Sequence, residues 1–93
     1  MRKYELLYAI AQDVSEEQRE ALIEKWKKFI EDRQGNVLNI DKWGMKKLAY
    51  PINYKNEGFF VLMNFESQPS LIKEMENAMN INEAIIRKMF FAK

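Results

Sequence analysis

The side chains of this chain that could carry chemistry are its lysines and arginines, which gather in three stretches without acidic residues. The stretches hold nine of the fifteen basic residues: Arg2, Lys3, Lys42, Lys46, Lys47, Lys55, Arg87, Lys88 and Lys93. Positive charges without neighbouring carboxylates attract phosphate groups, so the three stretches are candidate nucleic-acid contacts. The alternative is that these bases protect exposed strand edges against aggregation.

Histidine and cysteine are both absent from the sequence. Without cysteine there are no disulfides, thiolate metal ligands or cysteine nucleophiles. Histidine is the commonest metal ligand and has the side-chain pKa closest to neutrality, so its absence also removes routine acid–base catalysis. We therefore expect no enzyme, no catalytic residues, no metal site and no cofactor.

The serines, acids and glycines have structural explanations. Ser15, Ser67 and Ser70 lie at or near the starts of helical patterns, where a hydroxyl satisfies free backbone amides. The acids of residues 16–33 alternate with bases, as on a solvated helix face, which argues against a paired-carboxylate site. The three glycines are isolated from one another, so the sequence offers no glycine-rich phosphate-binding loop.

The length of 93 residues is that of one ordinary domain, and we assign residues 1–93 to a single domain. The net charge of +1 argues against a general polycation, which makes the distribution of charge more informative than its sum. No uncharged run approaches the roughly 20 residues that a membrane span needs, and the amino terminus lacks an apolar signal core. We expect the protein in the cytoplasm.

Two periodicities divide the sequence into six elements. Alternation of polar and apolar residues predicts strands at residues 2–11, 36–50, 59–66 and 84–91. Apolar residues spaced three and four apart predict a helix from about residue 16, capped by Ser15, and a second helix opened by residues 67–69.

Glycine and proline mark the expected breaks between these elements. Gly35 should end the first helix in the left-handed conformation. Gly44, inside a strand pattern, indicates a bulge or bend. Pro51 should close the strand, with the turn over residues 52–57.

The order β-α-β-β-α-β predicts an α+β fold, the ferredoxin-like split β-α-β sandwich. Its four-stranded antiparallel sheet carries two helices on one face, with the strands in the spatial order four, one, three, two. Strands one and four are then neighbours, so Arg2 and Lys3 should lie near the basic carboxyl terminus. The helical side should be mixed in charge and the sheet side basic.

The sheet face away from the helices is expected to be apolar at its centre. If Tyr4 and its alternate neighbours face the helices, then Leu7, Ala9, Phe60 and Leu62 lie on the open side. Exposed apolar patches often bind a protein partner. The alternative is that the chain's own loops cover them.

Four segments of the sequence resemble one known family. They are Met1–Glu5, Glu57–Phe60, Ile85–Met89 and the run Trp43-Gly44-Met45-Lys46-Lys47-Leu48-Ala49-Tyr50-Pro51-Ile52. In order and spacing they are similar to bacterial small-subunit ribosomal protein six. The resemblance implies a ferredoxin-like fold and a structural role in which the protein binds the central domain of small-subunit ribosomal RNA. It also implies a heterodimer with ribosomal protein eighteen during assembly.

The candidate sites follow from the basic stretches, the open face and the resemblance together. For RNA contact we expect Arg2, Lys3, Lys46, Lys47 and Arg87. For the protein partner we expect Trp43, Leu48, Tyr50, Phe60 and Leu62. The near-neutral net charge predicts that the chain alone binds RNA poorly and that the pair binds it tightly.

Two other functions share this element order. A single-stranded RNA reader of the RNA-recognition-motif type needs a small residue and a fixed aromatic spacing in its third strand, and Gly58-Phe59-Phe60-Val61 lacks them. A small acylphosphatase-like enzyme would need an anion-binding loop after the first strand, where Gln12-Asp13-Val14 offers neither glycine nor arginine. Both alternatives are weaker than the ribosomal interpretation.

Overall fold

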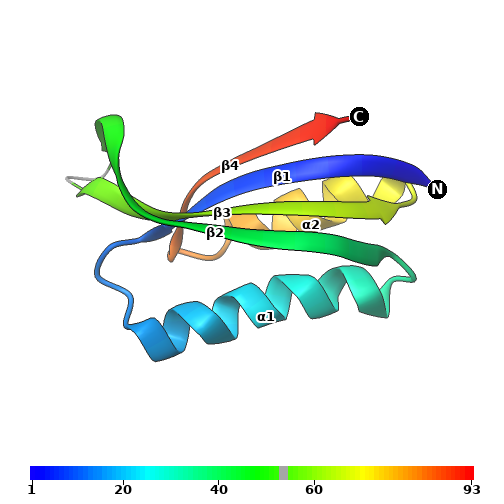
Figure 1. Ribbon diagram of the computed structural model, residues 1–93, viewed down its shortest axis with the longest axis horizontal. Helices are drawn as coiled ribbons and strands as arrows, with labels where there is room; N and C mark the ends of the chain where they lie inside the picture. Colours follow the sequence, from blue (N-terminus) through cyan, green and yellow to red (C-terminus); the bar gives the residue numbers. More distant parts are fainter. Residues whose placement is uncertain (53–54) are drawn as a thin grey trace.

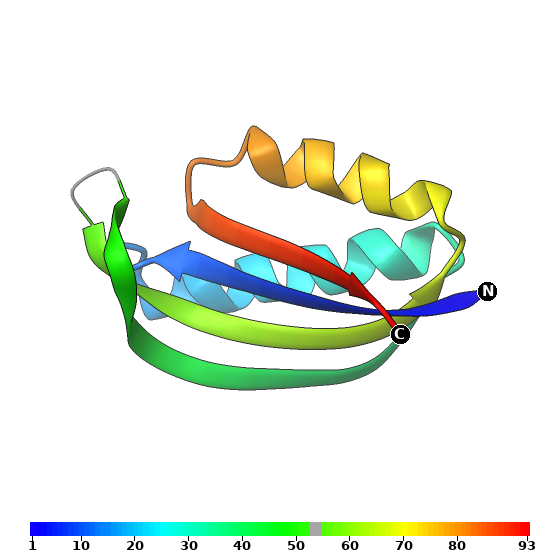
Figure 2. The same ribbon diagram turned by 90° about the horizontal axis from the view of Figure 1, so that it is seen from above.

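The six predicted elements are all present in the computed structural model, which describes residues 1–52 and 55–93, with the side chains of 49–52 and 55 left aside. The elements are β1 (Arg2–Ala11), α1 (Glu16–Asp32), β2 (Asn36–Ile52), β3 (Lys55–Ser67), α2 (Ser70–Asn80) and β4 (Ile85–Ala92). The strands form one antiparallel sheet in the order β2-β3-β1-β4. Both helices lie on the same side of it (Figures 1 and 2), so the predicted ferredoxin-like α+β fold is confirmed.

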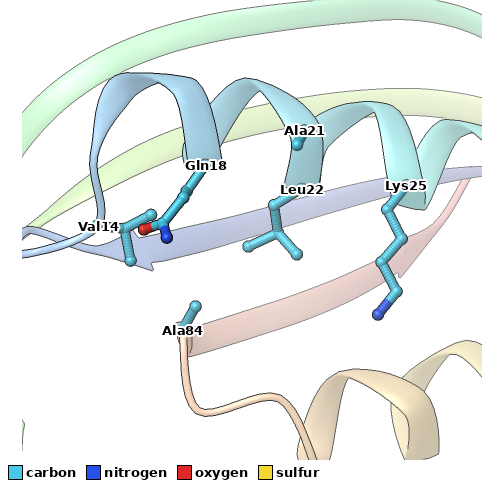
Figure 3. A pocket seen from close by; sticks show the side chains of 6 residues that line it. All are labelled: Val14, Gln18, Ala21, Leu22, Lys25 and Ala84. Carbon is cyan, nitrogen blue, oxygen red and sulfur yellow. The ribbon is translucent and has the colours of Figure 1, made fainter.

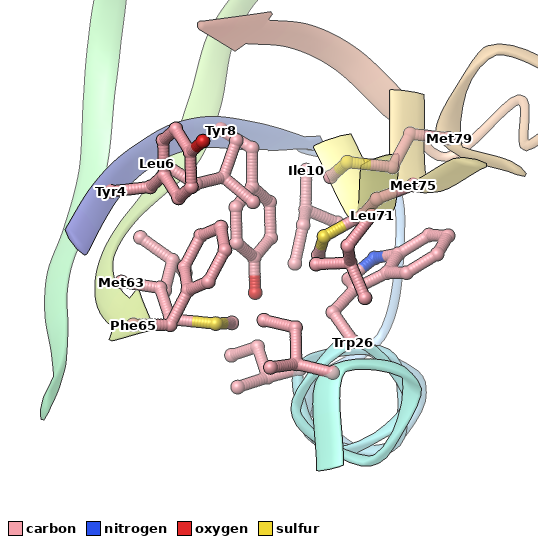
Figure 4. Packing of buried hydrophobic residues seen from close by; sticks show 13 residues of the cluster. Tyr4, Leu6, Tyr8, Ile10, Trp26, Met63, Phe65, Leu71, Met75 and Met79 are labelled. Carbon is pink, nitrogen blue, oxygen red and sulfur yellow. The ribbon is translucent and has the colours of Figure 1, made fainter. Parts of the chain in front are cut away.

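The hydrophobic core lies between the sheet and the two helices (Figure 4). Alternate residues of β1 and β3 point into it, and several of them have no exposed surface: Leu6, Tyr8, Ile10, Val61, Met63 and Phe65. The helices contribute Trp26, Ile30 and Met75, also fully buried. Burial of a large apolar side chain contributes about 1.5–3 kcal/mol, so this layer is the main source of stability.

Helix α1 begins as predicted and ends differently. The Ser15 hydroxyl accepts a hydrogen bond from the Gln18 amide at 3.2 Å. At the other end the left-handed residue is Gln34, with a φ of 65°, and not Gly35. Position 35 has no room for a side chain, because a Cβ atom there would lie 2.5 Å from Ile30 Cγ2.

Neither of the other two predicted serines is the capping residue of α2, since Ser70 is already its first helical residue. Ser67 is the last residue of β3, and its hydroxyl donates to the Gln68 carbonyl at 3.1 Å. The residue that precedes α2 is Pro69, which makes no side-chain capping bond. The proline side chain has no acceptor that could bond the free amides of the first helical turn.

The hairpin between β2 and β3 is longer than predicted. Pro51 does not close the strand, because β2 extends to Ile52 and that residue pairs with Lys55. The turn expected over residues 52–57 is therefore wrong in extent, and residues 53–54 lie outside the described chain. An edge strand such as β2 tolerates proline because one side of its backbone has no ladder partner.

The sequence indicated one irregularity in strand β2, and the structure has three. Its register with β3 shifts between Val37 and Asn39, between Lys42 and Gly44, and between Lys47 and Ile52. Gly44 has a φ of 92°, which confirms the predicted bend. Beyond it the hairpin curls away from the rest of the sheet (Figure 2), and we call residues 44–52 and 55–58 the arm.

Candidate nucleic-acid interface

The sheet register divides the five candidate RNA contacts between two regions. Arg2 and Lys3 lie at the end of β1 opposite Ser67 and Glu66 of β3. This is the end of the molecule that holds both chain termini, away from the arm (Figure 1). The five predicted bases therefore do not form a single patch.

The other three candidates lie toward the arm. Lys46 and Lys47 are opposite Gly58 and Glu57 within it, and Arg87 of β4 is opposite Ala9. The strand rise of about 3.3 Å per residue separates Ala9 from Lys3 by roughly 20 Å along β1. Contacts with one phosphate group can therefore involve one region or the other, but not both.

The terminal region has the predicted neighbours but a mixed charge. The Lys93 amide donates to the Lys3 carbonyl at 3.0 Å, so the basic carboxyl terminus does lie beside Lys3. However, Glu66 lies opposite Lys3, and the Lys93 ammonium is 3.5 Å from a Glu5 carboxylate oxygen. Two of the three bases in this region, Lys3 and Lys93, therefore have an acid beside them.

The expectation of a basic sheet side is thus wrong. Bases and acids are interspersed on the open face, where Glu5, Glu66 and Asp41 accompany Lys3, Lys46 and Arg87. The basic stretches lack acids along the sequence, but in the folded sheet they do not. Antiparallel pairing brings acids from neighbouring strands next to their bases.

The two arm lysines are exposed and lie on the projecting hairpin, although Glu57 is opposite Lys47 as Glu66 is opposite Lys3. Lys46 and Lys47 are both exposed, and neither has an ion-pair partner among the described residues. Lys42, only four residues before Lys46, is instead paired with Glu20 of α1. Two free lysines on a projecting hairpin are well placed to contact phosphates from outside the body of the protein.

The apolar centre of the open face lies where the alternation predicted it. Leu7 is paired with Leu62, and Ala9 with Phe60, on the face opposite the core. Ala9 is fully buried among its neighbours, whereas Leu7, Phe60 and Leu62 are half-buried. The chain's own loops therefore leave much of this surface open.

Strand β4 adds two apolar residues to this face that the sequence analysis missed. Met89 is opposite Leu7 and Phe91 is opposite Glu5, with exposed fractions of 38% and 43%. Arg87, Met89 and Phe91 alternate along the strand, and this alternation could have placed them on one face. The extra residue Ile86, at a register shift between β4 and β1, interrupts the alternation before Arg87.

Three of the five expected partner residues, Trp43, Phe60 and Leu62, lie where β2 runs beside β3. Trp43 is 43% exposed, and its indole nitrogen donates to Asp41 Oδ2 at 3.2 Å. Asp41 is opposite Leu62, and the next residue after Trp43 is opposite Phe60, so Trp43 adjoins the open apolar face. Leu48 is half-buried in the arm, and the Tyr50 side chain lies outside the described part of the chain.

The cavity beside α1 and the buried Tyr8 phenol do not form a reactive site. A cavity of about 320 Å³ lies between the start of α1 and the start of β4 (Figure 3) and is lined by Val14, Gln18, Ala21, Leu22, Lys25 and Ala84, which include no acid. Burial raises the pKa of the Tyr8 phenol above its ordinary value, and Glu20 adds to the rise. A phenol kept neutral inside the core is not a reactive group.

The described residues contain no group of three or more acidic, histidine or cysteine side chains arranged to hold a metal ion. Neither of their helices is long and apolar enough to cross a membrane.

Comparison with known proteins gives one consistent result. Residues 3–92 match the family model described as Ribosomal protein S6. The chain is 46% identical over 87 residues to the small ribosomal subunit protein bS6 of Caldanaerobacter subterraneus subsp. tengcongensis, which covers 94% of this chain and 92% of that protein. The bS6 of Desulforamulus reducens is 44% identical over 89 residues, with 96% and 94% covered.

Solved structures agree with the sequence comparison. The crystal structure of 30S ribosomal protein S6 from Thermotoga maritima matches this fold with a TM-score of 0.93 at 38% sequence identity. The match covers 99% of this chain and 87% of that chain.

Proposed function

This chain belongs to the ribosomal protein S6 family, and from that premise we propose that it binds the central domain of small-subunit ribosomal RNA as a heterodimer with ribosomal protein eighteen. Family membership makes the chain a structural component of the small ribosomal subunit, in the cytoplasm, and not an enzyme. The RNA site and the partner are the proposed part. The observation that carries them is an open apolar face beside a projecting arm whose Lys46 and Lys47 have no ion-pair partner among the described residues.

The open face supports the protein partner. Leu7, Leu62, Met89 and Phe91 give it an apolar centre, and the acids around that centre disfavour phosphate there. We assign the partner contact to this face with Phe60, Leu62, Trp43 and Leu48, and to Tyr50 on the strength of the family resemblance alone.

The basic side chains support the RNA contact. We assign the principal contacts to Lys46 and Lys47, which are exposed and have no ion-pair partner in the described part of the chain, with Arg87 beside the base of the arm. Arg2 and Lys3 are proposed as a second contact, because they lie at the other end of β1, away from the arm. These contacts position the backbone and do not select bases.

The net charge supports the proposal that tight RNA binding needs both proteins. At +1, with acids on the open face, the free chain has little general attraction for RNA. The chain alone should therefore bind weakly, and the pair should bind tightly.

The test is a salt-series titration of a central-domain fragment of small-subunit ribosomal RNA, with and without purified ribosomal protein eighteen. We expect tight binding only when both proteins are present, with an affinity that falls as salt rises. Equally tight binding of the isolated chain at physiological salt would contradict the heterodimer proposal. Binding of unstructured single strands by the isolated chain would favour the RNA-recognition-motif alternative.

A further inference from the structure

The bulge in β2 decides which lysine of the arm faces which side of the sheet. Before the bulge, Ile40 and Lys42 are opposite Met63 and Val61, on the helix-covered face. After it, the even-numbered residues have changed sides, because Gly44 and Lys46 are opposite Phe60 and Gly58 on the open face. A one-residue change of register moves every later side chain to the other face. Trp43 is the residue that makes this change.

Gly44 supplies the backbone conformation that the bulge needs. Its φ of 92° is one that residues with a side chain rarely adopt. A Cβ atom at this position would have no neighbour within 4 Å. The requirement for glycine is therefore conformational and not a matter of space.

The β3 side of the arm is held to the body of the protein. A Cβ atom on Gly58 would lie 3.0 Å from Ile86 Cδ1 and 3.2 Å from the Ala9 Cβ, so the backbone there packs closely onto the open face. The Glu57 amide donates to Gln12 Oε1 at 3.1 Å, which ties β3 to the loop after β1. Because β3 is fixed, the direction of the β2 lysines depends on the bend in β2.

From these contacts we propose that Gly44 is a positioning residue for RNA binding, since its left-handed backbone sets the face on which the arm presents Lys46. The proposal rests on the function proposed above. Gly44 itself contacts no phosphate, and it acts through the orientation of the lysines that follow it.

Substitution of Gly44 should lower affinity by depopulating the bent arm. An alanine disfavours positive φ, and an apparent affinity falls in proportion to the fraction of molecules in the competent form. We expect Gly44→Ala to weaken RNA binding by the heterodimer about tenfold and to leave the salt slope nearly unchanged, because the molecules that bind keep the same phosphate contacts. Asparagine tolerates positive φ better than alanine, so Gly44→Asn should lose less despite its larger side chain.

The experiment compares the unmodified protein with these two variants in three measurements. The first is the RNA salt series with ribosomal protein eighteen. The second is the cross-strand contact between Lys46 and Gly58 in the free protein, observed as a nuclear Overhauser effect. The third is the denaturation midpoint, which should fall only modestly in the order glycine, asparagine, alanine, because the strain is local and the core does not include the arm.

Each outcome is decisive. A weakened Lys46–Gly58 contact with a lower affinity in the order glycine, asparagine, alanine supports the proposal. Wild-type affinity and an intact contact in Gly44→Ala overturn it, and so does an equal or greater loss in Gly44→Asn, which would make side-chain bulk the cause. If the unmodified pair fails to bind RNA, the proposed function fails, while the contact measured in the free protein still decides the role of Gly44.

Discussion

The two faces of the sheet are built from adjacent residues of the same strands, yet only one face is covered by the helices. Leu6 on β1 and Met63 on β3 point toward the helices and have no exposed surface. Their neighbours Leu7 and Leu62 point the other way and remain half-buried. The apolar content of both faces is similar at the centre. What differs is whether the chain itself supplies a covering layer.

This difference shows that apolar residues in a strand can serve two purposes. The covered face is needed for folding, because burial there removes large side chains from water. The open face gains less from folding and keeps apolar surface available for another protein. Among the described lysines of β2, Lys46 and Lys47 on the arm have no ion-pair partner, whereas Lys42 pairs with Glu20 of α1.

The largest expected effect compares neighbouring leucines on the two faces. Leu6→Ala should lower the free energy of unfolding by about 3–4 kcal/mol, because it leaves a cavity in a closed core. Leu7→Ala should cost only about 1 kcal/mol, because the side chain is already partly exposed. Chemical denaturation measures both. Equal losses would show that the open face is also part of the core.

The second prediction concerns the partner. Leu62→Ala should weaken association with ribosomal protein eighteen by roughly thirtyfold, the effect of losing a central interface residue. Isothermal titration calorimetry measures this affinity. The matched control is Ile81→Ala, which removes an apolar side chain that is 85% exposed at the end of α2, away from the sheet. A comparable loss in the control would argue against a specific face.

The third prediction concerns the arm. Replacement of Lys46 and Lys47 together by glutamine should weaken RNA binding by the heterodimer roughly tenfold and lower the salt slope by about two. Replacement of Lys28 and Lys73, which are exposed on the helices, removes the same charge and should change affinity much less. If the helix variant lost as much affinity, general charge and not the arm would be responsible.

The smallest effect belongs to a polar atom on the covered face. Among the described residues, the Tyr8 hydroxyl is buried without a hydrogen-bond partner. Tyr8→Phe should therefore raise stability by about 1 kcal/mol at neutral pH. Stability measured by denaturation at several pH values provides the check, and a loss in the variant would show that the hydroxyl is satisfied.

The same residue predicts a pH dependence. Burial raises the pKa of Tyr8 in the folded protein, so the unfolded chain loses this proton first as pH rises. The folded state then retains more protons, and stability falls above about pH 10, the ordinary pKa of tyrosine. The Tyr8→Phe variant should lose less stability than the unmodified protein over that range.

The fold was predictable because local signals agreed with the global arrangement. The alternation in β1 and the Ser15 cap fixed two element boundaries, and the element order left few topologies. The end of β2 was not predictable in the same way. Pro51 usually stops a strand, and only the position of β2 at the sheet edge explains why the ladder continues.

The candidate sites were less predictable because they depend on pairing between distant segments. Sequence position could identify Lys46 and Lys47 as bases, but not that Lys42 nearby is paired with Glu20. It also could not show that Glu66 lies opposite Lys3. The faces of β4 required the register shift at Ile86, which no local pattern revealed.

The central claim is that the open face, and not the helical side, binds the partner protein. The most direct measurement is a titration of isotopically labelled methyl groups with ribosomal protein eighteen, followed by nuclear magnetic resonance. We predict that the methyl signals of Leu7, Leu62 and Met89 shift while those of Leu6 and Met75 in the core stay in place. Shifts confined to the outer surfaces of α1 and α2, with the open-face methyl groups unchanged, would contradict the claim.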